Sequence, residues 1–200
     1  IRVMGRRVVI IGDGAVGTAT AEMVWRKDPE ASIEIISEDP NPAYFRAALT
    51  NYLMGELTER QLHAVPPDFY DAHDITRHCG RVTQVDAKAR VVTTDEGTRY
   101  TYDHLVIATG SRARRPTFYG HDLHGIVTLR TLKEANAIVE ALATRPCEHG
   151  HVDHAVVVGG GPLALEWIYA LAQRKRRVTL LLRKPDSLMR GALDAVARDL

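Results

Sequence analysis

A strand, a glycine-rich turn and a helix occur twice in this chain, and the repeat limits the possible folds more than any other feature. The first copy has an apolar run at 6–11, a turn, a helix with apolar residues at helical spacing, and a strand at 32–37. The second copy has its apolar run at 155–158 and its second strand at 177–182. The two turns begin at Gly12 and Gly159, 147 residues apart, which is far longer than a solenoid period. The sequence therefore predicts an α/β protein built on two βαβ units.

The first turn has the glycine spacing GxGxxG. Its residues are, in order, Gly12, Asp13, Gly14, Ala15, Val16 and Gly17. In such a turn the first glycine permits a tight bend, the second lets the backbone approach a pyrophosphate, and the third lets the helix pack closely on the strand. The N-terminus of the helix then faces the anion. We predict a dinucleotide site here; a glycine turn required for backbone reasons alone is the alternative.

The next strand should end in an acidic residue that binds the hydroxyls of the ribose. Glu38 stands there, 26 residues after Gly12, because the turn at 28–30 lengthens the connection. Asp39 is the second candidate for the same role.

The second turn follows the same pattern less strictly. Its candidate cofactor-binding residues are Gly159, Gly161, Pro162 and Leu163, and Ala164 takes the place of the third glycine. Alanine is tolerated there because the position serves helix packing. Leu182 stands where the ribose-binding acid is expected and is followed by Arg183 and Lys184. These cations suit the 2′-phosphate of NADPH, and two solvated charges at a strand end are the alternative.

The segment between the two copies has another character. Three short β-like runs at 81–85, 89–94 and 99–101 are separated by turn residues, which predicts an antiparallel meander. A buried strand of the parallel type is expected at 104–108, ending in Thr109 and Gly110. A helix is predicted at 130–142 and a polar loop at 144–154.

Composition excludes several classes of partner. Hydrophobic residues make up 45% of the chain and charged residues 26%, which is typical of a globular protein. The net charge of +1 is too small to predict a nucleic-acid or anionic membrane partner. The longest apolar run, 155–165, is too short to span a bilayer. We therefore expect a globular protein with no nucleic-acid and no membrane partner; the oligomeric state stays open, a homo-oligomer included.

The cysteines predict no disulfide framework. Cys79 and Cys147 are far apart and neither belongs to a CxxC pair, which favours a reducing, cytoplasmic setting. The segment 147–154, CEHGHVDH, gathers possible zinc ligands, but its spacing matches no standard structural zinc site. We therefore predict no metal site.

Three segments carry a resemblance to a known family. They are YDHLVIATGS at 102–111, PAYFRAALTNYLMGE at 42–56 and GIVTLRTL at 125–132. Together with the two βαβ units they resemble the pyridine nucleotide-disulfide oxidoreductase superfamily. Within it, the chain looks most like the branch of ferredoxin and rubredoxin reductases and the flavin domain of assimilatory nitrite reductase. The resemblance extends over essentially the whole chain.

The resemblance implies a division into two domains. Residues 1–116 would form a Rossmann-like FAD-binding domain with the antiparallel meander. Residues 117–200 would begin a second Rossmann-like domain, which binds NAD(P)H through a nucleotide unit starting at 154. The rest of this domain and the closing FAD segment would then be absent, so we expect the chain to be the N-terminal part of a longer protein. We expect that this part alone does not hold FAD tightly and that the activity belongs to the full-length protein.

The implied activity is hydride transfer from NAD(P)H to FAD. Electrons would pass on to a ferredoxin, a rubredoxin or a fused redox domain. A non-catalytic or truncated nucleotide-binding module for redox sensing or assembly is the alternative. A coenzyme A or thiol disulfide reductase is disfavoured, because residues 40–56 contain no cysteine to act as the thiolate nucleophile.

Individual roles also follow from the resemblance. Arg46 would lie near the FAD pyrophosphate and Arg112 on the flavin side; a surface arginine is the alternative for Arg46. The chain would pass close to FAD at Ala108, Thr109 and Gly110, and Val82 of the meander belongs to the same cofactor-binding set.

The second helix carries the one candidate catalytic residue. Glu166 matches an acidic residue that approaches the nicotinamide and flavin in relatives, with a solvated helix glutamate as the alternative. Asn51 stands where many ferredoxin reductases have a lysine paired with this glutamate, so Glu166 is expected to lack that partner.

Overall fold

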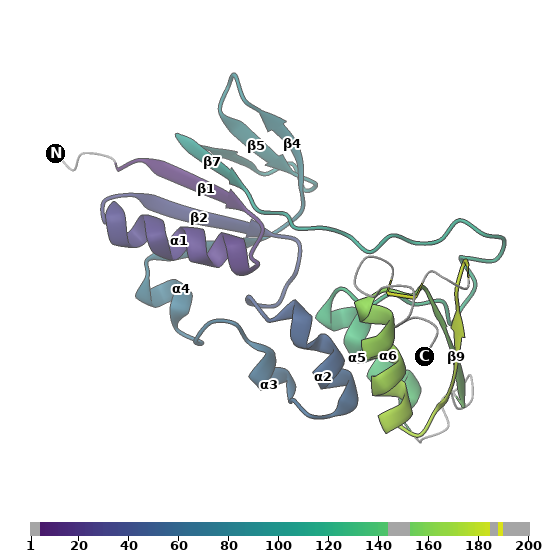
Figure 1. Cartoon of the computed structure of the whole chain (residues 1–200). Coiled ribbons are helices and arrows are strands. Elements are labelled where there is room, and N and C mark those ends of the chain that lie inside the picture. Colours follow the sequence, from purple (N-terminus) through teal and green to yellow (C-terminus); the bar gives the residue numbers. More distant parts are fainter. Residues whose placement is uncertain (1–4, 144–152, 185–187, 190–200) are drawn as a thin grey trace. The chain divides into compact units, whose positions relative to one another are not determined.

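The chain forms two compact units (Figure 1). The computed structural model describes residues 5–143, 153–184 and 188–189. The first unit comprises Ile1–Phe45 and His63–Arg112, and the second comprises Arg46–Leu62 and Ala113–Leu200. The segment 46–62 thus groups with the second unit although it lies between two segments of the first.

A four-stranded parallel sheet forms the centre of the first unit. Its strands are β1 (Arg7–Ile11), β2 (Ser32–Ser37), β3 (Ile75–Cys79) and β7 (His104–Ile107), in the spatial order β3-β2-β1-β7. Ile10 of β1 pairs with Ile35 on one side and with Val106 on the other. Helix α1 (Ala15–Lys27) connects β1 to β2 and completes the first predicted βαβ unit.

The two faces of this sheet are buried by different elements, because successive side chains of a strand point to opposite faces. Val8 and Ile10 lie in a cluster with Phe69 of the short helix α4 (Phe69–Ala72). Val9 lies on the other face, in a cluster with Val92 of the meander. Burial on both faces explains why β1 is an uninterrupted apolar run.

The meander is a separate antiparallel sheet of three strands, as predicted. These are β4 (Val82–Asp86), β5 (Val91–Thr94) and β6 (Arg99–Thr101). Strand β5 begins two residues later than expected, since Arg90 adopts a φ of 54° and cannot continue a strand.

The second unit contains the second βαβ copy and a group of helices. Its elements are η1 (Arg46–Ala48), α2 (Leu49–Met54), α3 (Glu59–Leu62), α5 (Leu132–Leu142), β8 (His154–Val158), α6 (Pro162–Gln173) and β9 (Arg177–Leu181). Strands β8 and β9 pair in parallel. Helix α5 begins later than expected, because Thr131 accepts a hydrogen bond from the Glu134 backbone N–H and forms a capping box with that residue.

Both βαβ units, the meander and the parallel strand at 104–108 are confirmed. Strand β3 and helices α2, α3 and α4 were not predicted. The expected polar loop at 144–154 lies outside the described residues except for its last two positions. Along the described part of the chain, every helix is too short or too polar to cross a lipid bilayer.

Candidate dinucleotide-binding site

The three glycines of the first turn meet three different surroundings. Gly12 has a φ of 108°, and a Cβ atom added to it would lie 2.3 Å from the carbonyl oxygen of Ala108. A Cβ atom on Gly17 would lie 2.0 Å from the carbonyl oxygen of Gly12. By contrast, a Cβ atom on Gly14 would meet no atom within 4 Å. The turn and the helix contact thus require Gly12 and Gly17, whereas Gly14 borders open space.

Helix α1 presents an uncapped N-terminus at this open space. Its N-cap is Gly14, no side chain caps it, and its first turn contains no acidic residue. Ala15 and Val16 are exposed, whereas Gly17 is buried. The first backbone N–H groups of a helix lack partners within the helix and carry its positive dipole end, so this arrangement suits a phosphate.

Two carboxylates follow β2, and they have different environments. Glu38 is half exposed, and its Oε2 accepts a hydrogen bond of 2.9 Å from Nη2 of Arg112. Asp39 accepts hydrogen bonds from the Asn41 backbone N–H at 3.2 Å and from the Tyr44 hydroxyl at 2.7 Å. Asp39 therefore holds its own loop together, and Glu38 is the carboxylate left at the surface. Arg112, expected on the flavin side, contacts Glu38.

The end of β7 lies against the first turn. The Ala108 N–H donates to the carbonyl oxygen of Ile11 over 2.8 Å, and the Ala108 carbonyl faces Gly12. The chain then turns at Gly110, which has a φ of 66°. Val82 packs beside the core cluster on the meander side of the sheet. The first turn and the Ala108–Gly110 stretch therefore meet at the carboxyl end of the parallel sheet, the edge at which such sheets bind ligands.

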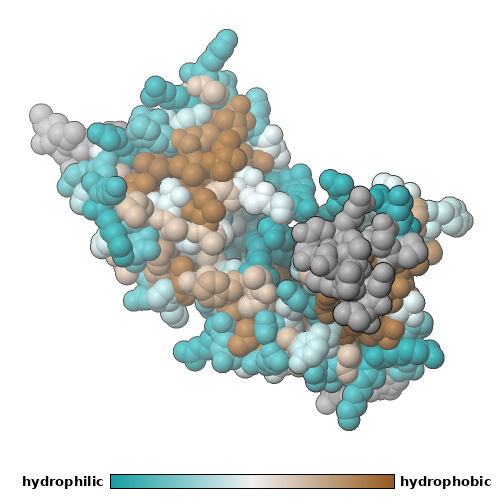
Figure 2. All heavy atoms as spheres, in the orientation of Figure 1, coloured by the Kyte–Doolittle hydropathy of each residue, from teal (hydrophilic) through white to brown (hydrophobic). Residues whose placement is uncertain are grey.

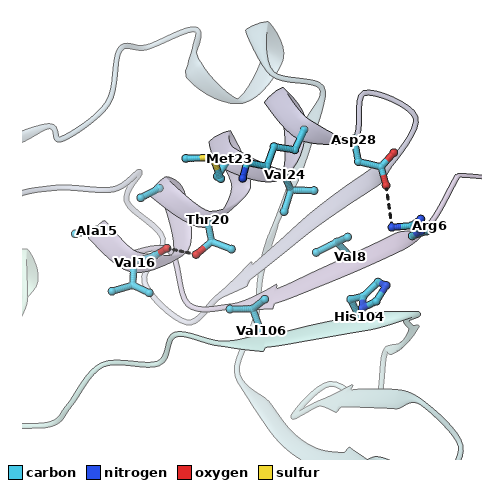
Figure 3. A pocket seen from close by; sticks show the side chains of 12 residues that line it. Arg6, Val8, Ala15, Val16, Thr20, Met23, Val24, Asp28, His104 and Val106 are labelled. Carbon is cyan, nitrogen blue, oxygen red and sulfur yellow. Dashed lines mark hydrogen bonds and ion pairs between the residues drawn. The ribbon is translucent and has the colours of Figure 1, made fainter.

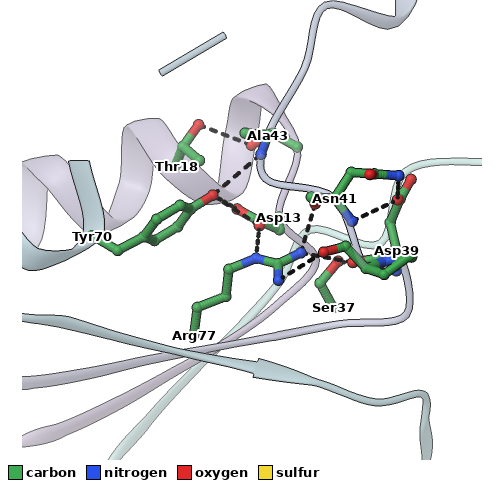
Figure 4. A network of polar contacts seen from close by, with 10 residues as sticks. Asp13, Thr18, Ser37, Asp39, Asn41, Ala43, Tyr70 and Arg77 are labelled. Carbon is green, nitrogen blue, oxygen red and sulfur yellow. Dashed lines mark hydrogen bonds and ion pairs between the residues drawn. The ribbon is translucent and has the colours of Figure 1, made fainter. Parts of the chain in front are cut away.

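A buried polar network lies beside the first turn (Figure 4). Asp13, between the first two glycines, has a side chain only 1% exposed and pairs with Arg77 of β3. The Tyr70 hydroxyl lies 3.0 and 2.9 Å from the two Asp13 carboxylate oxygens. Burial raises the pKa of Asp13 above its usual range, against the lowering effect of Arg77 and Tyr70. Burial also raises the pKa of Tyr70 to about 12.

Sequence reasoning missed this network. Asp13 occupies a variable position of the GxGxxG pattern, and its partners follow 57 and 64 residues later in elements that were not predicted. The one local signal was Asp13 itself. A carboxylate in a turn that is expected to bind an anion would repel that anion unless a cation lies nearby.

The second turn has a comparable backbone geometry. Gly159 has a φ of 119°, and its N–H donates to the Leu181 carbonyl over 3.0 Å. A Cβ atom on Gly161 would meet nothing within 4 Å. Gly161 caps α6 without a side-chain hydrogen bond, and Pro162 and Leu163 are exposed in its first turn. Arg183 and Lys184 follow β9 as exposed residues.

Glu166 in α6 has a partner that the sequence did not suggest. The Thr50 hydroxyl of α2 donates to Oε2 of Glu166 over 3.2 Å, and Thr50 is buried. The neighbouring Asn51 instead donates to Glu56 over 2.8 Å. The side chain of Arg46 donates to the Arg130 carbonyl over 2.8 Å, also within the second unit.

A shallow groove of about 700 Å³ runs along α1 beside β1 and β7 (Figure 3). Its lining includes Val8, Val24 and Val106, with the Arg6–Asp28 ion pair at one end. Figure 2 shows a hydrophobic area on the first unit, which contains this groove. The groove begins at the first turn but continues toward the amino ends of the strands, so most of it offers hydrocarbon rather than catalytic groups.

The described residues contain no group of three or more His, Cys, Asp or Glu side chains that could hold a metal ion. Most of the segment 147–154, whose composition suggested zinc, lies outside those residues.

Comparisons with known proteins agree with this geometry. The sequence pattern of the family described as pyridine nucleotide-disulphide oxidoreductase matches residues 6–200. The chain is 31% identical over 189 residues to the chlorobenzene dioxygenase, ferredoxin reductase component, of Cupriavidus sp. (strain PS12), covering 93% of this chain and 44% of that protein. It is 36% identical over 169 residues to the large subunit of the NAD(P)H nitrite reductase of Klebsiella oxytoca, covering 83% and 17%.

A solved structure shows the same fold. The NAD-dependent persulfide reductase from A. fulgidus superimposes with a TM-score of 0.84 at 29% identity, covering 96% of this chain and 37% of that one. The chain thus spans less than half the length of each of these relatives.

Proposed function

The chain belongs to the pyridine nucleotide-disulphide oxidoreductase family, and from this premise we propose that it binds FAD at the first turn and NAD(P)H at the second, as part of an oxidoreductase. When bound, the flavin would supply the redox chemistry, taking up a hydride from the nicotinamide and releasing electrons to an acceptor. The observation that carries the proposal is the open space at Gly14, in front of an uncapped helix N-terminus. The protein's own residues bind and orient the two nucleotides.

The first unit has groups of the right chemistry for the ADP half of FAD. The free N–H groups at the start of α1 would donate to pyrophosphate oxygens, with Gly14 allowing their approach. Glu38 would accept hydrogen bonds from ribose hydroxyls, which compete with its present contact to Arg112. Thr109 and Gly110 belong to the same edge of the sheet. Arg46 as a pyrophosphate contact and Asp39 as a second ribose acceptor remain predictions.

The second unit would bind NADPH in preference to NADH. Gly159 and Gly161 form the phosphate turn, and no acidic residue stands at the end of β9 to bind a free 2′-hydroxyl. Arg183 and Lys184 stand there instead, and a 2′-phosphate is recognised by such cations. Glu166, on the first turns of α6 and held by Thr50, is the proposed residue near the reacting nicotinamide.

The electron acceptor would be a small redox protein or a redox module of the same assembly. The name of the chlorobenzene dioxygenase relative identifies a ferredoxin reductase component. The nitrite reductase large subunit is a much longer chain, of which this one covers 17%. A ferredoxin, a rubredoxin or a fused redox domain is therefore the proposed partner.

Flavin absorbance provides the direct test. The purified full-length protein, of which this chain is the expected N-terminal part, should bind FAD and show the visible flavin bands. Addition of NADPH under anaerobic conditions should bleach those bands, and NADH should do so more slowly. A protein that fails to bind FAD, or whose bound flavin is not reduced by either nucleotide, would overturn the proposal.

A further inference from the structure

Arg77 joins two loops that would each bind a different part of one ligand. Its Nε contacts the carboxylate of Asp13 in the first glycine turn. Its Nη2 donates to the carbonyl oxygens of Asp39 and Asn41, both at 2.6 Å, and Nη1 donates to that of Pro40 at 3.3 Å. The guanidinium group therefore bridges the first glycine turn, where the pyrophosphate is proposed to bind, and the loop that follows Glu38 (Figure 4).

Tyr70 makes a second bridge between the same regions. Its hydroxyl contacts both carboxylate oxygens of Asp13 and accepts a hydrogen bond from the Ala43 N–H at 3.2 Å. Ala43 lies two residues beyond the carbonyls that Arg77 holds. The two bridges are neighbours, with the Arg77 guanidinium 5.9 Å from the centre of the Tyr70 ring.

The Asp13–Arg77 pair also determines the charge beside the turn. Both side chains are shielded from water, with exposed fractions of 1% and 16%. An unpaired carboxylate at Asp13 would repel a pyrophosphate that approaches Gly14. Arg77 cancels this charge, so the N–H groups at the start of α1 face the anion without a competing negative charge.

From this geometry we propose that Arg77 is a positioning residue of the FAD site, which fixes the spacing between the pyrophosphate turn and the ribose-binding Glu38. The inference rests on the proposed function and deepens it. In this role Arg77 would act through its protein contacts and not by binding the ligand. It would hold the first glycine turn and Glu38 at the separation of the pyrophosphate and the ribose of an ADP group. One ligand could then contact both at once.

Arg77→Lys separates this role from simple neutralisation of Asp13. A lysine keeps the positive charge, but its single nitrogen cannot reach acceptors on both loops as the three guanidinium nitrogens do. Arg26→Lys is the matched control, because Arg26 is an exposed arginine of the same unit paired only locally with Glu22. Tyr70→Phe is a second variant, which removes the other bridge without changing charge.

The experiment follows the backbone amide signals of Gly14 and Glu38 by NMR. Inorganic pyrophosphate, adenosine and ADP are titrated separately into the full chain. In the wild type and in Arg26→Lys, ADP should shift both signals with one Kd far below those of pyrophosphate and adenosine. In Arg77→Lys the Kd for ADP should rise roughly tenfold, while the Kd values for pyrophosphate and adenosine stay within about twofold of the wild type.

Other outcomes overturn the inference. An unchanged Kd for ADP means that Arg77 does not set the spacing, and equal weakening of all three ligands means that it only supports the fold. If Arg77→Lys fails to fold, Tyr70→Phe decides, with a selective loss of ADP affinity expected and its absence contradicting us. If ADP shifts neither signal in the wild type, the proposed function fails, and the inference with it.

Discussion

The carbonyl oxygen of Gly12 lies 2.0 Å from the place that a Cβ atom on Gly17 would occupy. The start of α1 therefore rests directly on the backbone of the turn. Three positions earlier, a Cβ atom on the N-cap residue Gly14 would meet no atom within 4 Å, and Gly14 has a φ of −100°, which any residue can adopt. Two glycines of one motif thus serve different purposes, and substitution should separate them.

Gly17→Ala should destabilise the fold, because the new methyl group meets backbone that cannot rotate away. We expect the free energy of unfolding to fall by about 1–3 kcal/mol. Gly14→Ala should leave that free energy unchanged or slightly higher, since alanine restricts the unfolded chain. Its effect should be a loss of FAD affinity. Urea unfolding and FAD titration of both variants measure the contrast, and a Gly14→Ala protein that binds FAD like the wild type would contradict the site.

Substitutions of Glu38 and Asp39 should likewise separate an effect on FAD affinity from an effect on stability. Glu38→Ala removes a half-exposed carboxylate whose surface ion pairs with Arg81 and Arg112 each contribute at most about 1 kcal/mol to stability. It should instead weaken binding of FAD by the value of a charged hydrogen bond, roughly tenfold or more. Asp39→Ala should cost about 1–2 kcal/mol of stability, because Asn41 and Tyr44 lose their acceptor. Thermal unfolding with and without FAD distinguishes the two; equal effects would refute the assignment.

Glu134 should make the second unit sensitive to acid. Burial acts to raise its pKa, but hydrogen bonds from Thr128, Thr131 and the Arg130 N–H outweigh burial and hold the pKa of Glu134 below its usual range. A carboxylate with a lowered pKa stabilises the fold above its unfolded-state pKa, and this contribution is lost as the pH falls through the folded-state pKa.

Glu134→Gln should therefore lower stability at pH 7, by about 1 kcal/mol. The difference from wild type should shrink as the solution is acidified below pH of about 4. Urea unfolding at a series of pH values checks this. Glu140→Gln, in the same helix and outside the capping box, is the control, and a pH-independent difference for Glu134→Gln would contradict the prediction.

Arg183 and Lys184 should determine the choice of nicotinamide nucleotide. The double substitution Arg183→Ala, Lys184→Ala should raise the KM for NADPH about tenfold or more, because two charged contacts to the 2′-phosphate are lost. The KM for NADH should change little. Flavin reduction rates at varied concentrations of each nucleotide give both values, and the exposed pair Arg114→Ala, Arg115→Ala serves as the control. An equal rise in the KM for NADPH and for NADH would show that Arg183 and Lys184 do not recognise the 2′-phosphate.

Thr50→Val should test the position of Glu166. Valine keeps the buried shape of Thr50 but removes its hydroxyl, and the exposed Glu166 can turn to water, so the stability cost should stay near 1 kcal/mol. Flavin reduction should slow, because the proposed site needs this hydrogen bond to hold Glu166 near the nicotinamide. Asn51→Ala, which removes the contact to Glu56, should leave that rate unchanged. Equal rates for Thr50→Val and wild type would show that Thr50 does not position Glu166 for the reaction.

The parts of the fold that depend on local patterns were predictable. Strand β1, the glycine turn and α1 follow one another directly, and the apolar run and helical spacing identify them. Strand β3 escaped prediction because it lies at the sheet edge and contains Arg77 and His78, so its sequence lacks an apolar run. The Asp13–Arg77 pair escaped for a further reason, since it joins residues 64 apart through a strand that periodicity does not reveal.

The same limit applies to Thr50 and Glu166. They lie 116 residues apart, on two helices whose packing no local pattern specifies. The sequence pointed to Glu166 and to Asn51, which follows Thr50 in the chain. Which of these two α2 residues contacts Glu166 depends on which face of α2 turns toward α6. Helix packing is a tertiary property, and the spacing of residues in the sequence does not predict it.

The pairing of β7 with β1 has a consequence for the order of folding. Val8 to Ile11 align with His104 to Ile107, and the meander lies within the intervening chain. Contacts of such long sequence separation form slowly, because a large loop must close before they stabilise anything. The backbone at Gly12 lies against the carbonyl of Ala108, so the first glycine turn acquires this contact only after nearly a hundred further residues have been synthesised. During translation the first glycine turn would therefore reach its final conformation late, after the strand that follows the meander has joined the sheet.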